Sequence, residues 1–507
     1  MDEASYISSV ESIGLKATWN QICFDVLQSI ENSAIPVESF GDFYEAGLAA
    51  SDKDAKKESG QYYTPHDVAM VMAQWFDSVP GDIICDVACG TGNLILAYLE
   101  YIGRERSIDL LENGKIHLYD MDSVAMQICV TAIALRYGKQ FLSKINVHCG
   151  DFLSREITLP KHSKVISNPP YSTFSSIHFE WHQTPTVLST KELYAAFMEK
   201  IMLQSEGSVV ITPYSFIGGH KFYPLRCVMN KYNGFVVSFD NVPGNIFCGR
   251  KHGIFNSNTS NAVRAAITVV QNHPDYRGFR FSHLIRFKAI EREKLIQCET
   301  LENMVGKTYQ QVDQHNSMFS KCDVRLEQLF LRWKRQSTLP LGGYIRPYGR
   351  FEIHIPNTCR YFTVASAKPL TRKGQISIRL DDEMVFYYVF CMINSSFAYW
   401  WWRIYDGGIT YPQRLLHQLP LFFDKLSETD KQFFKEIASE MIAHADEFIV
   451  TKNNVGIQEN IKYPRTYRDK INQRIISILN FDMQEQTLDI IHSNMAMEVN
   501  LCEEKSL

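Results

Sequence analysis

The four residues Asn168-Pro169-Pro170-Tyr171 combine a side-chain amide, two prolines and an aromatic ring in one short stretch. An amino group conjugated to an aromatic ring is a poor nucleophile, because its lone pair is delocalised into the ring. If the Asn168 side-chain oxygen and the Pro169 carbonyl accept both of its hydrogens, the lone pair becomes localised on nitrogen. The prolines fix φ and lack N–H donors, which lets that carbonyl face a pocket, and Tyr171 offers a flat face for stacking. The stretch predicts activation of a planar amine, although alone it fits a Pro-Pro turn after a strand equally well.

Two glycines and two acidic residues upstream of this stretch follow or end expected strands. Gly90 and Gly92 allow the backbone to approach a ligand closely at the start of a helix. Asp120 is placed to accept hydrogen bonds from ribose hydroxyls, and Asp151 is placed to accept the amino group of a bound adenine. Each acid could instead cap a helix or belong to a loop. Their shared placement at successive strand ends favours a nucleotide-like ligand.

The elements that must position these residues alternate between strand and helix. The expected strands span residues 82–87, 116–119, 145–148, 164–167 and 208–212. One helix is expected to begin at Thr64-Pro65, and another spans 191–204. This alternation predicts an α/β fold with a mainly parallel sheet and crossover helices. Ligands of such a sheet bind beyond the carboxyl ends of its strands, where the residues above are expected to lie.

Four regions are expected along the chain. Residues 1–58 form a helical segment, residues 59–295 form the α/β domain, residues 296–425 form a mixed α+β region and residues 426–507 form a helical region. In the last region, helices are expected near 427–450 and 466–480.

Composition predicts a cytoplasmic protein without a membrane partner. The chain has 507 residues, and no apolar run reaches the roughly 18 residues that span a bilayer. The acidic N-terminus does not resemble a signal peptide. The 12 cysteines are scattered, without a Cys-x-x-Cys pair, which fits a reducing compartment and no metal site. Cys85 and Cys89 are expected to be buried apolar side chains.

The net charge of −4 conceals a basic segment between Arg332 and Arg379. Ten basic residues stand there against a single acid, Glu352, which gives a local charge of 10 − 1 = +9. Such a segment predicts a polyanionic partner, and a merely solvated basic face is the alternative.

Five elements in a fixed order carry a family resemblance: Gly60-Gln61-Tyr62-Tyr63-Thr64-Pro65, Asp86-Val87-Ala88-Cys89-Gly90-Thr91-Gly92-Asn93, Tyr119-Asp120-Met121-Asp122, Gly150-Asp151-Phe152-Leu153 and Asn168-Pro169-Pro170-Tyr171. Residues 59–270 thereby resemble the S-adenosylmethionine-dependent DNA adenine-N6 methyltransferases. Their order resembles that of the gamma group, which includes type I modification subunits and TaqI-like enzymes. The resemblance implies a Rossmann-like methyltransferase domain.

The resemblance also implies roles for individual residues. The cofactor would be S-adenosyl-L-methionine, bound by Tyr62, Thr64, Pro65, Asp86, Ala88, Gly90, Gly92, Asp120, Asp151 and Phe152. The catalytic residues would be Asn168, Pro169, Pro170 and Tyr171, acting on N6 of an adenine flipped out of double-stranded DNA. Asp122 is expected to cap a helix. Phe247 is a candidate second face for the target base, with a buried structural role as the alternative.

The C-terminal region resembles a target-recognition domain over 296–425. Its expected DNA-binding residues are Arg346, Arg350, Arg360, Lys368, Arg372 and Lys373. The aromatic residues between Asn394 and Trp402 resemble a segment of specificity regions, where we expect packing more than DNA contact. The chain is expected to serve restriction-modification or epigenetic marking, alone or with a separate restriction enzyme or specificity subunit. No nuclease pattern is apparent, so the chain is not expected to cut DNA itself.

Four alternatives remain open from the sequence. RNA adenine methylation needs the same chemistry, and a protein-glutamine methyltransferase can use the same loop on a side-chain amide. Cytosine-N4 methyltransferases more often carry Ser at the position of Asn168. The fourth alternative is a catalytically silent DNA-binding subunit.

Overall fold

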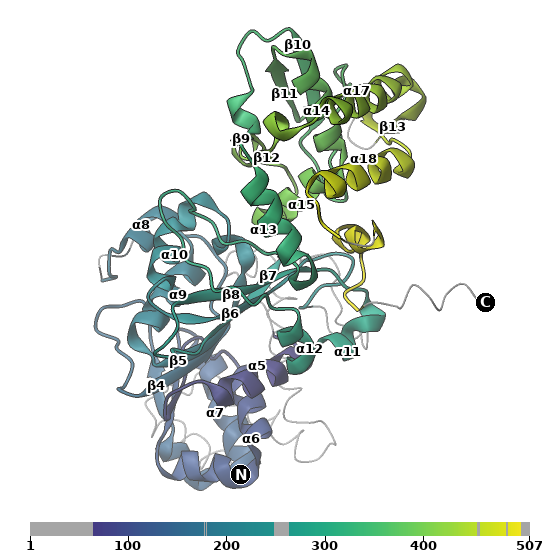
Figure 1. Cartoon of the computed structure of the whole chain (residues 1–507). Helices are drawn as coiled ribbons and strands as arrows, with labels where there is room; N and C mark the ends of the chain where they lie inside the picture. The colour runs from purple at the N-terminus through teal and green to yellow at the C-terminus, as the bar shows by residue number, and fades with distance from the viewer. Residues whose placement is uncertain are drawn as a thin grey trace, which may run out of the picture. The chain divides into compact units, whose positions relative to one another are not determined.

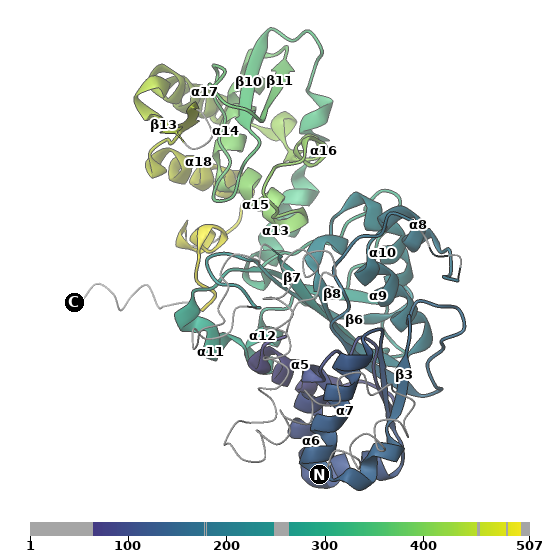
Figure 2. The ribbon, with the colours of Figure 1, turned by 180° about the vertical axis from the view of Figure 1, so that it is seen from behind.

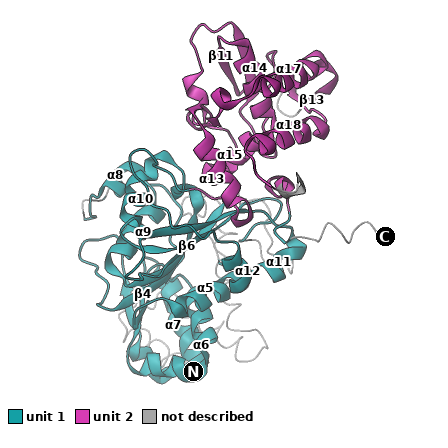
Figure 3. Ribbon diagram, viewed as in Figure 1, with its two compact units in different colours: residues 1–319, 495–507 teal, residues 320–494 magenta. Residues whose placement is uncertain are grey.

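The computed structural model describes residues 64–176, 178, 180–247, 263–453, 457–482 and 485–497 (Figure 1; Figure 2 gives the reverse view). The predicted helical segment 1–58 and Tyr62 lie outside the described residues. The chain divides into two compact units, shown in Figure 3. Unit 1 comprises residues 1–319 and 495–507, and unit 2 comprises residues 320–494.

Unit 1 is built on an eight-stranded, mainly parallel sheet with the order β3-β2-β1-β4-β5-β7-β6-β8. Only β7 runs antiparallel to its two neighbours. The strands are β1 (Ile83–Asp86), β2 (Ile116–Asp120), β3 (Asn146–Cys149), β4 (Ser163–Ser167), β5 (Gly207–Pro213), β6 (Asn233–Phe239), β7 (Ala265–Val270) and β8 (Gly278–Ile285). The predicted Rossmann-like α/β fold is confirmed, and the five expected strands agree with β1 to β5 within about two residues at each end.

Helices cover both faces of this sheet (Figures 1 and 2). They are α5 (His66–Ser78), α6 (Asn93–Glu112), α7 (Ser123–Tyr137), α8 (Pro185–Thr190), α9 (Leu193–Gln204), α10 (Tyr223–Met229), α11 (Arg292–Leu295) and α12 (Cys298–Asn303). One apolar core joins the sheet to α5, α6, α7, α11 and α12, and a second joins it to α9 and α10. Neighbouring residues of a strand point to opposite faces, so Val165 enters the second core and Ile166 the first. Both faces of β4 are therefore buried.

Unit 2 has a mixed α+β architecture. Its helices are α13 (Glu327–Gln336), α14 (Glu383–Asn394), α15 (Ser396–Tyr405), α16 (Gln413–His417), α17 (Glu428–Ala443) and α18 (Arg465–Ile478). Its strands form the pairs β10 (Phe351–Pro356) with β11 (Gln375–Leu380), β12 (Pro420–Leu421) with β9 (Leu339–Pro340), and β13 (Ile449–Asn453) with β14 (Ile457–Ile461). The two expected C-terminal helices correspond to α17 and α18.

The boundaries expected at 295 and 425 differ from this division. Residues 296–319 group with unit 1, and α14 packs against α17 within unit 2. For example, the ring of Tyr388 on α14 meets that of Phe434 on α17 edge to face, with centroids 5.1 Å apart. Aromatic packing therefore unites segments on both sides of residue 425.

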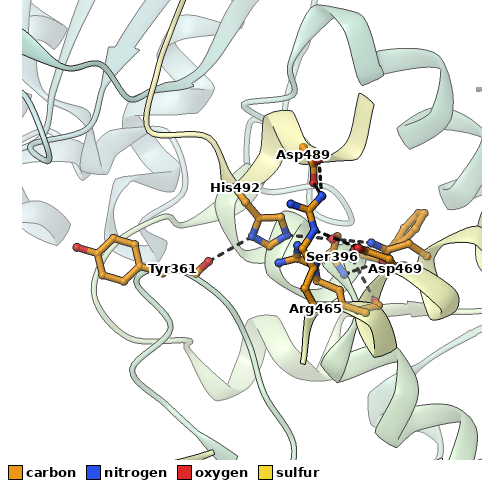
Figure 4. A network of polar contacts seen from close by, with 10 residues as sticks. Tyr361, Ser396, Arg465, Asp469, Asp489 and His492 are labelled. Carbon is orange, nitrogen blue, oxygen red and sulfur yellow. Dashed lines mark hydrogen bonds and ion pairs between the residues drawn. The ribbon is translucent and has the colours of Figure 1, made fainter. Parts of the chain in front are cut away.

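The aromatic run of α15 is buried, as expected for packing: Trp400, Trp401 and Trp402 all lie in the interior of unit 2. The 3-10 helix Glu485–His492 is held to the rest of unit 2 by polar contacts, shown in Figure 4. A hydrogen bond of 2.9 Å joins Ser396 Oγ to His492 Nε2, and Arg465 forms an ion pair with Asp489. Among the described residues, no helix is both long enough and apolar enough to cross a membrane.

Candidate functional site

A pocket of about 450 Å³ opens at the carboxyl ends of β1, β2, β3 and β4. Nine of the residues predicted to bind ligand or act in catalysis line it: Thr64, Asp86, Ala88, Gly90, Asp120, Asp151, Phe152, Asn168 and Pro170. Four other predicted residues, Pro65, Gly92, Pro169 and Tyr171, do not line the pocket. The pocket thus brings together groups that are more than 100 residues apart in the sequence, such as Thr64 and Asn168.

Asp86, at the end of β1, is the most deeply buried acid of the pocket, with 1% of its surface exposed. Its Oδ1 accepts a hydrogen bond from the Ala88 N–H at 3.3 Å. Within the described residues, Oδ2 has no hydrogen-bond partner, and neither has the buried Thr91 Oγ1. Burial raises the pKa of Asp86 to about 8; the Ala88 N–H lowers it, and the nearby Asp120 raises it further. Buried polar atoms of this kind normally have partners, so both atoms point to a ligand with hydrogen-bond donors.

Asp120, at the end of β2, joins two loops of the site. Its Oδ2 accepts from the Gly90 N–H at 2.7 Å, and its Oδ1 accepts from the Asp122 N–H at 2.9 Å. Burial raises the pKa of Asp120, whereas these two backbone hydrogen bonds lower it. Asp122 caps α7 by accepting from the N–H groups of Val124 and Ala125, as predicted, and it also lines the pocket.

Asp151, after β3, is fixed by two hydrogen bonds. The Leu153 N–H donates to its Oδ1 at 2.9 Å, and the Trp181 Nε1–H donates to its Oδ2 at 2.5 Å. Trp181, with Phe174 and His178, forms an aromatic wall of the pocket. Sequence reasoning missed this wall. The available signal was the presence of aromatic residues in the polar segment that follows Tyr171.

Asn168, directly after β4, is oriented by Thr64, which lies two residues before α5. The Asn168 Nδ2 donates to Thr64 Oγ1 at 2.9 Å. This hydrogen bond turns the nitrogen of the amide toward Thr64 and therefore its oxygen away from Thr64. Both side chains line the pocket. The amide oxygen is thus held in a defined direction before a substrate binds.

Tyr171 is partly buried and is anchored by contacts with the cores of unit 1. Its hydroxyl donates to the Ile211 carbonyl at 3.3 Å. Its ring meets Tyr194 and Phe247 edge to face, with centroids 6.4 and 6.0 Å away. Phe247 has 8% of its surface exposed and belongs to the core, which favours the structural alternative for this residue.

The two glycines of the β1–α6 loop have different surroundings. Gly90, at φ +50°, lines the pocket, and a Cβ there would meet no atom within 4 Å. Gly92, at φ +98°, would place a Cβ 2.6 Å from Cys129 Sγ on α7. Gly90 therefore borders ligand space, whereas Gly92 allows close packing between α6 and α7. Cys85 and Cys89 are buried, as expected.

The six cations predicted to bind DNA lie in unit 2 and differ in their partners. Arg346, Arg350 and Lys373 are exposed and have no carboxylate partner within the described residues. Lys368 forms an ion pair with Asp446 at 3.0 Å. Arg372 donates to Asn460, and its partial burial lowers its pKa. Arg360 is half-buried. The charge of the basic segment is thus less available than the sequence suggested.

A loop with two of these cations presents an aromatic ring to solvent. Tyr348, between Arg346 and Arg350, has 93% of its surface exposed. The Arg346 N–H donates to the Arg379 carbonyl at 2.8 Å, and a Cβ at Gly349 would lie 2.6 Å from the Leu380 nitrogen. The loop therefore lies tightly against the end of β11.

No group of three or more His, Cys, Asp or Glu side chains in the described part of the chain is arranged to hold a metal ion.

Residues 37–213 match the family model described as N-6 DNA Methylase. Over 167 residues the chain is 25% identical to a type I restriction enzyme MpnII methylase subunit of Mycoplasma pneumoniae, covering 29% of this chain and 28% of that protein. Over 136 residues it is 27% identical to a type I restriction enzyme MjaVIII methylase subunit of Methanocaldococcus jannaschii, covering 26% and 23%. The chain therefore matches only about a quarter of the length of these curated relatives.

Among solved structures, the M protein of the type I restriction enzyme EcoKI is similar with a TM-score of 0.36 and 14% identity. The similarity covers 51% of this chain and 54% of that chain. The family match and the methylase-subunit relatives confirm the predicted resemblance to DNA adenine-N6 methyltransferases.

Proposed function

We propose that this chain is a DNA methyltransferase that moves the methyl group of S-adenosyl-L-methionine to N6 of an adenine in double-stranded DNA. The observation that carries the proposal is that one pocket brings Asn168 together with Asp86, Asp120 and Asp151, within a segment that matches the N-6 DNA methylase family. The relatives are subunits of restriction enzymes. We therefore propose a restriction-modification role, with a separate restriction or specificity subunit as the partner.

The donor groups of the pocket fit the proposed cofactor. Asp86 and Thr91 supply buried oxygen atoms that need donors, which the ammonium and hydroxyl groups of the cofactor provide. Asp120 holds the ribose, Asp151 and Phe152 hold the adenine ring, and Thr64 and Ala88 border the methionine half. Gly90 leaves space for close approach. When bound, the cofactor supplies an electrophilic methyl group on a sulfonium.

The catalytic loop activates the target amine. The Asn168 oxygen and the Pro169 carbonyl accept its two hydrogens, so that the lone pair becomes localised on nitrogen. Thr64 contributes by fixing which end of the Asn168 amide faces the substrate. No covalent intermediate with the protein is needed, and positioning supplies much of the rate. The target adenine must leave the base stack to reach this loop.

Unit 2 supplies the contacts to DNA in this proposal. The exposed Arg346, Arg350 and Lys373 suit phosphate oxygens, and Tyr348 offers a flat face between two of these cations. Lys368, Arg360 and Arg372 are weaker candidates, because an ion pair or burial already engages them.

A transfer assay with methyl-labelled S-adenosylmethionine tests the proposal. Purified protein should label double-stranded DNA, and digestion to nucleosides should place the label in N6-methyladenosine. Asn168→Ala should abolish labelling but still bind S-adenosylhomocysteine. Label found only on RNA, on protein or on cytosine would contradict the proposal and would indicate a methyltransferase with that substrate instead. No label on any of these substrates would indicate either a silent subunit or a missing partner. Adding a type I specificity subunit distinguishes the two cases, because only a chain that lacks its partner would then transfer label.

A further inference from the structure

Lys200 is a buried cation that belongs to neither the predicted nor the observed pocket lining. It lies on α9, and 8% of its surface is exposed. Its ammonium group donates to three carbonyl oxygens: those of Phe152 at 2.5 Å, Ser154 at 2.8 Å and Ile157 at 2.7 Å. An ammonium has three N–H donors, so all of them are used on one short segment.

That segment begins at the residues proposed to hold the cofactor adenine. Phe152 lines the pocket, and its ring lies over the Lys200 ammonium, 4.7 Å from ring centroid to nitrogen. Asp151, the preceding residue, accepts a hydrogen bond from the Trp181 Nε1–H. The Arg155 N–H donates to the Glu180 carbonyl, and the Arg155 side chain donates to the Trp181 carbonyl. The 151–157 segment is therefore fastened both by α9 and by the chain that follows Tyr171.

Burying a charged amine without a carboxylate directly bonded to it is unfavourable unless its donors are all satisfied. Burial lowers the pKa of Lys200 to about 8, and the negative charge of Asp151 raises it. An apolar side chain would fill this space without such a requirement. The ammonium, in contrast, fixes the position of α9 relative to the segment that carries Asp151 and Phe152, because it bonds to three carbonyls of that segment.

We propose that Lys200 is a positioning residue for the adenine half of the cofactor, because it sets the place of Asp151 and Phe152 in the pocket. The proposal rests on the proposed function, since it concerns the same cofactor. Lys200 does not touch the pocket itself and acts only through the 151–157 segment.

The chain contains a matched control for this role. Lys164 on β4 is similarly buried, with 5% of its surface exposed, and burial lowers its pKa to about 8 as well. Its ammonium donates to the Phe76 carbonyl at 2.9 Å and to the Asp77 carbonyl at 3.5 Å, at the end of α5. Neither Lys164 nor these two acceptors line the pocket. Replacing Lys164 therefore tests the loss of a buried ammonium without moving Asp151.

Titration calorimetry on the full chain, with S-adenosylhomocysteine and with adenosine as probes, tests the proposal. Lys200→Met should weaken binding of both probes by on the order of tenfold, because both contain the adenine that Asp151 and Phe152 are proposed to hold. Lys164→Met should lower the melting temperature similarly and leave both Kd values unchanged. Equal weakening in the two variants, or none in Lys200→Met, overturns the proposal. Absence of binding to the unaltered chain would instead refute the proposed function.

A second measurement avoids substitution, in case Lys200→Met does not fold. In the unaltered chain, S-adenosylhomocysteine should slow amide hydrogen exchange in residues 152–157 and in α9. Exchange at the end of α5, beside Lys164, should remain unchanged. Exchange in 152–157 that is unaffected by the ligand would show that this segment does not respond to the cofactor.

Discussion

The side-chain nitrogen of Asn168 donates to the hydroxyl oxygen of Thr64 across 2.9 Å, and so connects the start of α5 to the end of β4. An asparagine amide has a donor end and an acceptor end of nearly equal size. The proposed chemistry needs the acceptor end to face the target amine. Thr64 fixes that choice by engaging the donor end.

Replacing Thr64 tests this orientation. Thr64→Val keeps the shape but removes the acceptor, and leaving a buried donor unsatisfied costs roughly 1–3 kcal/mol. Because 1.36 kcal/mol corresponds to tenfold in rate, we expect kcat for methyl transfer to fall by about 10- to 100-fold. Thr64→Ser retains a hydroxyl oxygen and should stay near the unaltered rate. Single-turnover kinetics at saturating cofactor distinguishes the variants. Equal rates for Val and Ser would show that the hydrogen bond does not orient the amide for catalysis.

The carboxyl of Asp86 is expected to make binding of the proposed cofactor depend on pH. The pKa of its carboxyl is about 8 in the folded protein, so it holds a proton at neutral pH. A ligand ammonium favours the ionised form and must displace that proton. As pH increases toward 8, the association constant of S-adenosylhomocysteine should therefore rise by up to about tenfold per pH unit. Above pH 8 it should level off.

The same shift has a consequence for the protein without ligand. Burial raises the folded pKa of Asp86 above its unfolded value, so the folded protein holds this proton more tightly than the unfolded chain. The free energy of unfolding is therefore highest below the unfolded pKa and falls as pH rises toward and through 8.

The proton displaced by the ligand can be measured directly. Calorimetry in buffers with different ionisation enthalpies should detect about one proton released per ligand at pH 7. Asp86→Asn removes the titrating group and should show no such release. A release that persists in Asp86→Asn would assign the proton to another group.

Alanine substitutions at Gly90 and Gly92 should have separable effects. At Gly92 the new Cβ would lie 2.6 Å from Cys129 Sγ, so we expect a loss of about 2 kcal/mol or more in unfolding free energy. At Gly90 the Cβ meets no protein atom, and the left-handed backbone costs roughly 1–2 kcal/mol. Gly90→Ala should therefore weaken cofactor binding more than Gly92→Ala, and should destabilise less. Urea unfolding and calorimetry measure the two effects, and the reverse ranking would contradict this assignment.

The exposed loop of unit 2 should contribute to DNA affinity. Arg350→Gln removes a cation without a carboxylate partner within the described residues, whereas Lys368→Gln removes one that is paired with Asp446. We expect the first change to reduce the slope of log Kd against log salt by about 1, and the second to change it little. Tyr348→Ala should weaken binding with the slope preserved, because a stacking contact releases no counterions. Fluorescence anisotropy over a range of salt concentrations provides these slopes. An unchanged slope in Arg350→Gln would exclude a phosphate contact at that side chain.

The sequence could predict the part of the site that depends on strand order. Buried apolar runs ending in Asp86, Asp120 and Asn168 identify strands, and parallel strands bring their carboxyl ends to one edge of a sheet. The prediction therefore placed these residues together without any knowledge of packing. The part of the sheet formed by β6, β7 and β8 was not predicted. In it, β7 runs antiparallel between β5 and β6, and long segments of chain separate these strands in the sequence.

The rest of the site depends on contacts between distant segments. Lys200 bonds to carbonyls 43–48 residues away, and nothing in the local pattern of α9 distinguishes it from an exposed lysine. Gly92 and Gly90 look alike in the sequence, yet only the proximity of Cys129 shows that one of them serves packing. The available positive charge of the basic segment was overestimated for the same reason. Asp446, which pairs with Lys368, lies 78 residues further along the chain.

The chain leaves unit 1 at Phe319 and returns to it at Met495. Phe319 is buried in one core of unit 1, and Ala496 is buried in the other, where the Met497 N–H donates to Glu291. During translation the ribosome must therefore deliver all of unit 2 before the last pieces of the unit 1 core arrive. Unit 2 is an insertion with two fixed ends, so any domain exchanged for it must begin after Phe319 and lead back to Met495.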